Sequence, residues 1–104
     1  MSIVYLVVPC YNEEAVLPET CKQLTEKLRS LITQGSVSPE SRILFVDDGS
    51  KDRTWKLVEQ YHQENTLISG VKLAHNRGHQ NALLAGLMAA KEYADCAISL
   101  DADL

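Results

Sequence analysis

Aromatic side chains and clusters of positive charge are both scarce in this sequence of 104 residues. Phe, Trp and Tyr make up 6% of the residues, which is too few for a surface on which successive nucleobases stack. The formal net charge is −4, and lysine and arginine are scattered along the chain. Proteins that bind nucleic acid need such cations in clusters to neutralise phosphates. We therefore expect no nucleic-acid partner, and an anionic ligand would need a metal ion or a helix N-terminus.

Long hydrophobic runs and spaced cysteine pairs are also missing. The apolar run at 3–8 is far shorter than the roughly 20 residues that span a membrane, and no signal-peptidase site follows it. Cys10, Cys21 and Cys96 have no metal-ligand spacing, and each lies in or beside an apolar stretch. We expect them to be small core residues in a reducing compartment. These features predict a soluble, cytoplasmic chain.

Short apolar runs alternate with helical repeats along the chain, and the length suits one domain. The apolar runs predict strands at 3–8, 42–46, 68–74 and 96–100. The helical repeats predict a helix from Pro18 to near Gly35, a second capped by Asp52 and extending through Tyr61, and a third over 81–93. This alternation predicts a Rossmann-like α/β fold, with a mostly parallel sheet and helices on both faces.

Polar side chains gather directly after each predicted strand. The four groups are Asn12, Glu13 and Glu14; Asp47 and Asp48; His75, Asn76 and Arg77; and Asp101 and Asp103. Open α/β sheets bind ligands beyond the carboxyl ends of their strands. We therefore expect all four groups on one rim of the sheet.

Two interpretations fit each acidic group. Asp101 and Asp103 can converge on a divalent cation such as Mg²⁺ or Mn²⁺, or they can form a solvated acidic turn. Asp47 and Asp48 can accept hydrogen bonds from a base or a ribose, or they can simply begin an Asp-Gly turn. Such a turn needs only one aspartate, so the second is better explained by a ligand. The group after the first strand is equally open, because acidic residues there also complement a helix dipole.

Two side chains in these loops are suited to a nucleotide in other ways. Tyr11 can lie flat against a nucleobase. Arg77 is a candidate for contact with a phosphate or a base carbonyl.

Three segments carry a resemblance to a known family. They are Val-Val-Pro-Cys-Tyr-Asn-Glu-Glu at 7–14, Val-Asp-Asp-Gly-Ser-Lys-Asp at 46–52 and Leu-Asp-Ala-Asp-Leu at 100–104. In this order they resemble the family 2 glycosyltransferases of GT-A type. The segment 76–86 is similar to the branch that charges polyprenyl or dolichyl phosphate with a sugar, although Arg77 stands where that branch commonly has an aromatic residue. The resemblance implies that 1–104 is a partial nucleotide-sugar-binding domain, truncated at the Asp-x-Asp motif.

The resemblance also implies a set of site residues. Those that would bind the donor are Pro9, Tyr11, Glu13, Asp47, Asp48, Arg77, Asp101 and Ala102, and the metal ligands for Mg²⁺ or Mn²⁺ would be Asp101 and Asp103. Asp48 would hydrogen-bond the base while Asp47 supports the turn. Any catalytic base would lie beyond Leu104, so the resemblance implies none within these residues.

The implied reaction is inverting transfer of a sugar from a UDP- or GDP-sugar to a lipid-phosphate or glycan acceptor. The full-length protein would work at the inner face of the membrane, which its C-terminal part would contact, and the isolated 104-residue chain would be inactive. Two alternatives remain open. One is a phospho-accepting receiver domain, whose acidic pair should follow the first strand. The other is a nucleotide-binding regulatory module without transferase activity.

Overall fold

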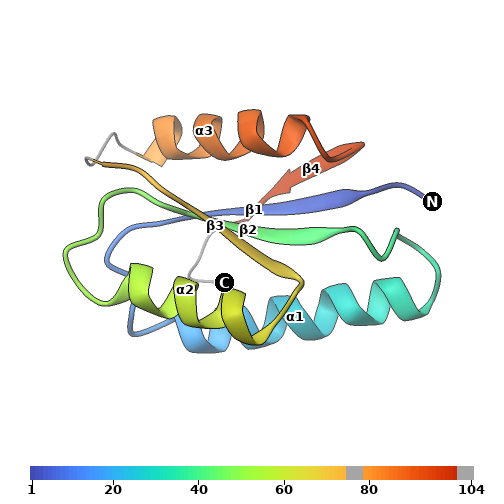
Figure 1. Cartoon of the computed structure of the whole chain (residues 1–104), viewed down its shortest axis with the longest axis horizontal. Coiled ribbons are helices and arrows are strands. Elements are labelled where there is room, and N and C mark those ends of the chain that lie inside the picture. The colour runs from blue at the N-terminus through green and yellow to red at the C-terminus, as the bar shows by residue number, and fades with distance from the viewer. Residues whose placement is uncertain (75–78, 101–104) are drawn as a thin grey trace.

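The computed structural model describes residues 1–74 and 79–100, in which strands and helices alternate (Figure 1). The strands are β1 (Val4–Cys10), β2 (Arg42–Asp47), β3 (Ile68–Lys72) and β4 (Cys96–Ser99). The helices are α1 (Leu17–Thr33), α2 (Thr54–Glu64) and α3 (His79–Lys91). Each predicted element is present, with boundaries that differ from the prediction by a few residues.

The four strands form one parallel sheet in the order β3-β2-β1-β4. The chain moves outward from β1 to β2 and β3, and then returns to place β4 on the other side of β1. This reversal places a topological switch point between β1 and β4, and open α/β sheets bind their ligands at such a point. The order also contradicts the receiver-domain alternative, because in that fold β1 lies between the second and third strands.

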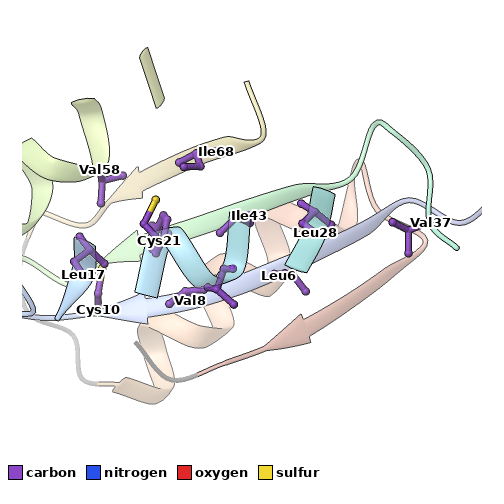
Figure 2. Close-up of a cluster of buried hydrophobic side chains, with 12 residues drawn as sticks. Leu6, Val8, Cys10, Leu17, Cys21, Leu28, Val37, Ile43, Val58 and Ile68 are labelled. Atoms are coloured by element: carbon purple, nitrogen blue, oxygen red, sulfur yellow. The ribbon is translucent and has the colours of Figure 1, made fainter. Parts of the chain in front are cut away.

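Helices cover both faces of the sheet, as predicted. α1 and α2 lie on one face and α3 lies on the other (Figure 1). Successive residues of a strand point to opposite faces, so Val8 packs toward α1 whereas Val7 packs toward α3. The core beneath α1 and α2 is built from Leu6, Val8, Leu17, Cys21, Leu28, Ile43, Val58 and Ile68, among others (Figure 2).

Helix α3 lies unusually close to the sheet at Gly86. A Cβ atom at this position would be 2.5 Å from Cγ1 of Val7 and 2.7 Å from Cγ2 of Val46. Carbon atoms in contact normally lie about 3.5–4.0 Å apart. The glycine therefore sets how closely α3 packs on β1 and β2.

The prediction for the cysteines was right for two residues and wrong for the third. Cys10 and Cys21 are buried, but Cys96 is exposed. Cys96 pairs with Val4, on the face that α1 and α2 cover. In the described part of the chain β4 is an edge strand, and all four of its residues are exposed. On the face of Cys96, α1 and α2 pack over the other strands, which leaves this thiol uncovered.

The first strand was predicted to end at residue 8, just before Pro9, but Pro9 lies within β1 and is buried. Backbone groups two residues apart on a strand point to the same side, so Pro9 faces β4 as Val7 does. Val7 accepts a hydrogen bond from the Leu100 N–H at 2.9 Å, and the pairing of β1 with β4 ends at Val7 and Ser99. At Pro9, two residues further along, the pairing with β4 has ended, so the missing N–H of proline breaks no hydrogen bond between these strands.

We predict that Gly86→Ala destabilises the fold despite the better helix propensity of alanine. Overpacking against Val7 and Val46 costs about 1–3 kcal/mol, and the propensity gain offsets about 1 kcal/mol of it. Chemical denaturation should show a net loss. Met88→Ala, at a side chain of α3 that is 63% exposed, is the control and should change the unfolding free energy by less than about 0.5 kcal/mol. Equal stability of Gly86→Ala and wild type would contradict the close packing.

Candidate functional site

The loops that follow β1 and β2 meet at the carboxyl ends of their strands, at the left of the view in Figure 1. The backbone N–H of Asp48 donates to the Cys10 carbonyl at 2.9 Å, which extends the pairing of the two strands to their last residues. This contact places the polar group after β2 beside the polar group after β1. The two loops thus share one rim, as predicted.

Asp47 is fully buried at the end of β2, and its carboxylate is committed to the turn that follows. The backbone N–H of Ser50 lies 3.3 and 3.4 Å from the two carboxylate oxygens, and the Ser50 hydroxyl donates to one of them. Gly49 closes the turn with a φ of 75°, which glycine adopts at low cost. A buried carboxylate is costly unless it is hydrogen-bonded, so Ser50 is what permits Asp47 here.

Asp48 and the loop after β1 provide the polar groups nearest to this turn. Asp48 is buried, with 3% of its surface exposed, and Tyr11 is 36% exposed directly after β1. The Glu13 carbonyl accepts the N–H groups of Val16 and Leu17 and so begins α1. These positions bring the predicted residues Tyr11, Glu13 and Asp48 onto one short stretch of the rim.

Cys10 lies beneath these residues as a neutral thiol. It is 3% exposed, and its Sγ lies 3.6 Å from the Val46 carbonyl. Burial, followed by the negative charges of Asp47 and Glu13 among others, raises the pKa of this thiol to about 12. A thiol with so high a pKa is a poor nucleophile. Cys10 therefore acts as a packing residue at this site.

Asp52 sits at the start of α2 with a carboxylate that remains ionised at neutral pH. Partial burial raises its pKa, but hydrogen bonds from the side chain and backbone of Thr54 and from the Glu14 N–H outweigh it and hold the pKa below its ordinary value. Asp52 was predicted to cap α2. The structure places Arg53 at the cap position, where it makes no side-chain hydrogen bond. Asp52 lies one residue earlier, and its carboxylate accepts the N–H of Thr54, the first residue of the helix, at 2.9 Å.

The remaining predicted site residues lie outside the described residues. They are Arg77, Asp101, Ala102 and Asp103, together with His75 and Asn76. Within 1–74 and 79–100, no group of three or more His, Cys, Asp or Glu side chains is placed to hold a metal ion. The described residues that gather at the rim are thus Pro9, Tyr11, Glu13, Asp47 and Asp48.

Sequence reasoning did not assign Asn12, Ser50 or Thr54 to the contact between the two loops, although hydrogen bonds to their side-chain oxygens join the loops. The sequence offered one signal, because asparagine in a loop is enriched at left-handed backbone positions. Asn12 occupies such a position in the structure, with a φ of 51°. The partners of Asn12 could not be found this way, because Ser50 and Lys51 lie 38 and 39 residues away in the chain.

The rim can be compared with proteins of known family. Residues 5–104 match the model of the family described as glycosyl transferase family 2. The chain belongs to this family. The match spans both polar loops of the rim, and it extends over the Asp-x-Asp segment at 101–103.

Curated relatives agree with the assignment. The uncharacterized glycosyltransferase YkoT of Bacillus subtilis (strain 168) is 55% identical over 102 residues, which are 98% of this chain and 30% of YkoT. The undecaprenyl-phosphate 4-deoxy-4-formamido-L-arabinose transferase of Shewanella sediminis (strain HAW-EB3) is 34% identical over 105 residues, which are 100% of this chain and 29% of that protein.

Solved structures share the fold. The mannosyltransferase PcManGT from Pyrobaculum calidifontis, in complex with GDP-Man and Mn²⁺, superposes with a TM-score of 0.79 at 24% identity, over 98% of this chain and 28% of that one. S. aureus TarS 1-349 in complex with UDP superposes with a TM-score of 0.65 at 27% identity, over 97% of this chain and 27% of that one.

The chain thus spans about 30% of the length of the curated relatives that it matches. Its expected place as the donor-binding half of a larger GT-A domain stays a prediction.

We predict that Cys10 resists alkylation in the folded protein. Its pKa of about 12, against an ordinary 9.0, leaves almost no thiolate near neutrality. Iodoacetamide at about pH 8 should modify Cys10 only after unfolding in urea, as measured by peptide mass spectrometry. Cys96, which is exposed, is the internal positive control in the 104-residue chain. Rapid labelling of native Cys10 would contradict its burial.

The same pKa shift fixes the sign of a pH dependence. The folded protein holds the Cys10 proton more tightly than the unfolded chain does. This contribution to stability is therefore fully present below about pH 9 and is lost as the pH rises toward about 12.

Proposed function

We propose that this chain is the nucleotide-binding part of a glycosyltransferase that takes its sugar from a nucleoside diphosphate donor. One observation carries the proposal: in a family 2 chain, the loops after β1 and β2 meet beside the switch point of the sheet and bring Tyr11, Glu13 and Asp48 together. Open α/β sheets bind nucleotides at such a point.

The donor contacts that we propose follow from the chemistry of these side chains. Tyr11 is exposed enough to lie against the base. Asp48 accepts a hydrogen bond from the base, and Glu13 accepts one from a ribose hydroxyl. Asp47 supports the turn, and its hydrogen bonds with Ser50 support this role. Pro9 completes the wall of the site at the end of β1, and Arg77 is proposed to contact the donor.

The proposed metal ligands are Asp101 and Asp103, which come after β4 and Leu100 in the sequence. Two carboxylates without soft ligands suit Mg²⁺ or Mn²⁺, which complete their coordination with water and diphosphate oxygens. PcManGT was solved with GDP-Man and Mn²⁺, which supports a metal-assisted donor site here. A bound metal ion would offset the charge that develops on the leaving diphosphate. Asp101 and Ala102 would also contact the ribose or diphosphate.

The acceptor that we propose is a polyprenyl phosphate, and the transfer inverts the anomeric centre. Support comes from the segment 76–86 and from the Shewanella relative, whose name gives undecaprenyl phosphate. A lipid phosphate is ionised at neutral pH, so the site has to position it more than deprotonate it. None of the helices in the described part of the chain is long and apolar enough to cross a membrane. The contact that we propose with the inner face of the membrane is made by the C-terminal part of the full-length protein.

The first test is a calorimetric titration of the full-length protein with UDP, GDP and their sugars, with and without Mn²⁺. We expect one nucleotide to bind, and the binding to require the metal. Removing a metal ligand with Asp103→Ala should weaken it by at least about tenfold. Glu59→Ala changes an exposed carboxylate on α2 that is not among the proposed site residues, and it should leave the affinity unchanged. No nucleotide binding under any condition would contradict the proposal.

A second test separates a transferase from a regulatory nucleotide-binding module. The full-length protein, given the labelled sugar nucleotide that it binds, Mn²⁺ and undecaprenyl phosphate in detergent, should form a labelled glycolipid. The 104-residue chain should not, because it spans less than a third of its relatives. Nucleotide binding by the full-length protein with no transfer to undecaprenyl phosphate or to a glycan would favour the regulatory alternative.

A further inference from the structure

We infer that Asn12, Ser50, Asp52 and Thr54 are positioning residues of the donor site, because their side chains lock the loop after β1 to the loop after β2. This inference rests on the proposed function, since the locked loops carry the groups proposed to hold the nucleotide. We refer to these four residues as the interloop clamp. None of them is proposed to touch the substrate.

The first half of the clamp is a reciprocal pair of hydrogen bonds around Asn12. The Asn12 N–H donates to Oγ of Ser50 at 2.8 Å, and the Lys51 N–H donates back to Oδ1 of Asn12 at 2.8 Å. The Ser50 hydroxyl in turn donates to the buried carboxylate of Asp47. The left-handed backbone of Asn12, next to Tyr11, is therefore tied to the end of β2.

The second half of the clamp is centred on Thr54, which is fully buried at the start of α2. Its Oγ1 accepts the Glu13 N–H at 2.8 Å and donates to Oδ1 of Asp52 at 2.5 Å. The other carboxylate oxygen of Asp52 accepts the Glu14 N–H at 3.3 Å. The backbone at Glu13 is thus held by residues of the opposite loop.

These bonds satisfy three consecutive N–H groups, those of residues 12, 13 and 14, in the loop between β1 and α1. The N–H groups of a loop have no partner within a strand or a helix, so other groups have to accept from them. Here every acceptor is a side chain of the loop after β2 or of the first residue of α2. The loop after β1 therefore takes its conformation from the loop after β2.

This dependence has a consequence for binding. A nucleotide gripped by Tyr11 and Glu13 on one side and by Asp48 on the other needs the two loops at a fixed separation. Groups that are not held in place beforehand have to be ordered when the substrate binds, and this ordering costs entropy and weakens binding. Loss of the clamp should therefore lower nucleotide affinity through residues that make no contact with the nucleotide.

The test uses the full-length protein and isothermal titration with UDP and GDP in the presence of Mn²⁺. Thr54→Val keeps the shape of the side chain but removes the hydroxyl, whereas Thr54→Ser keeps the hydroxyl. We expect Thr54→Val to weaken binding of the nucleotide that wild type prefers by about five- to tenfold, and Thr54→Ser to stay within about twofold of wild type. Rescue by serine is the result that a packing role alone does not produce.

Asn12→Gly provides an independent test if Thr54→Val does not fold, because Asn12 is exposed and glycine tolerates its positive φ. It should weaken nucleotide binding to a similar degree. Adding Ser50→Ala should then cost less than its own separate effect, because both changes remove parts of the same hydrogen-bonded unit.

The control is Asn65→Ala at the other end of α2. Asn65 accepts the Leu67 N–H at 3.0 Å, so its loss also removes a bond between a side chain and the backbone. Asn65→Ala should lower the melting temperature without changing nucleotide affinity. If wild type binds a nucleotide and the clamp variants bind it equally well, the clamp is overturned while the proposed function stands. The same conclusion follows if Asn65→Ala weakens nucleotide binding as much as the clamp variants do. If wild type binds neither nucleotide, both are overturned.

Discussion

Parallel pairing of β1 with strands on both of its sides is the constraint on which the rest of the structure depends. It makes β1 a central strand that α1 and α3 cover on opposite faces, which is why Val7 and Val8 are both inaccessible to solvent. It also directs the carboxyl ends of neighbouring strands to the same edge, so that polar loops from distant parts of the chain meet there. Gly86 allows α3 to approach β1 and β2 closely, and α1 covers the opposite face of the sheet.

The rim that results combines burial and charge, which are hard to reconcile. Asp47 has no exposed surface and Asp48 almost none, and both lie near the buried thiol of Cys10. Burial of carboxylates is tolerable only where donors surround them. For Asp47 the donors are the N–H and hydroxyl of Ser50, and the same hydroxyl accepts from the loop after β1. The interaction that makes a buried aspartate possible is thus also the one that joins the two loops.

The order of strands and helices could be predicted from the sequence, because apolar runs and helical periodicity are local properties. The position of Asp47 and Asp48 on the rim followed from it. The exposure of Cys96 could not be predicted, because an apolar run does not show whether its strand lies at the edge of a sheet. The partners of Asn12 and Thr54 were also beyond prediction, since they depend on the register between β1 and β2. The roles of Asp101 and Asp103 stay predictions.

The most direct test of the central claim is a crystal structure of the full-length protein with its preferred nucleoside diphosphate and Mn²⁺. The account predicts that the nucleotide lies between the loops after β1 and β2, with its base against Tyr11 and within hydrogen-bonding distance of Asp48. A nucleotide bound elsewhere, for example in the cavity lined by Trp55, His62 and Gly70 at the α2 and β3 side of the sheet, would contradict it.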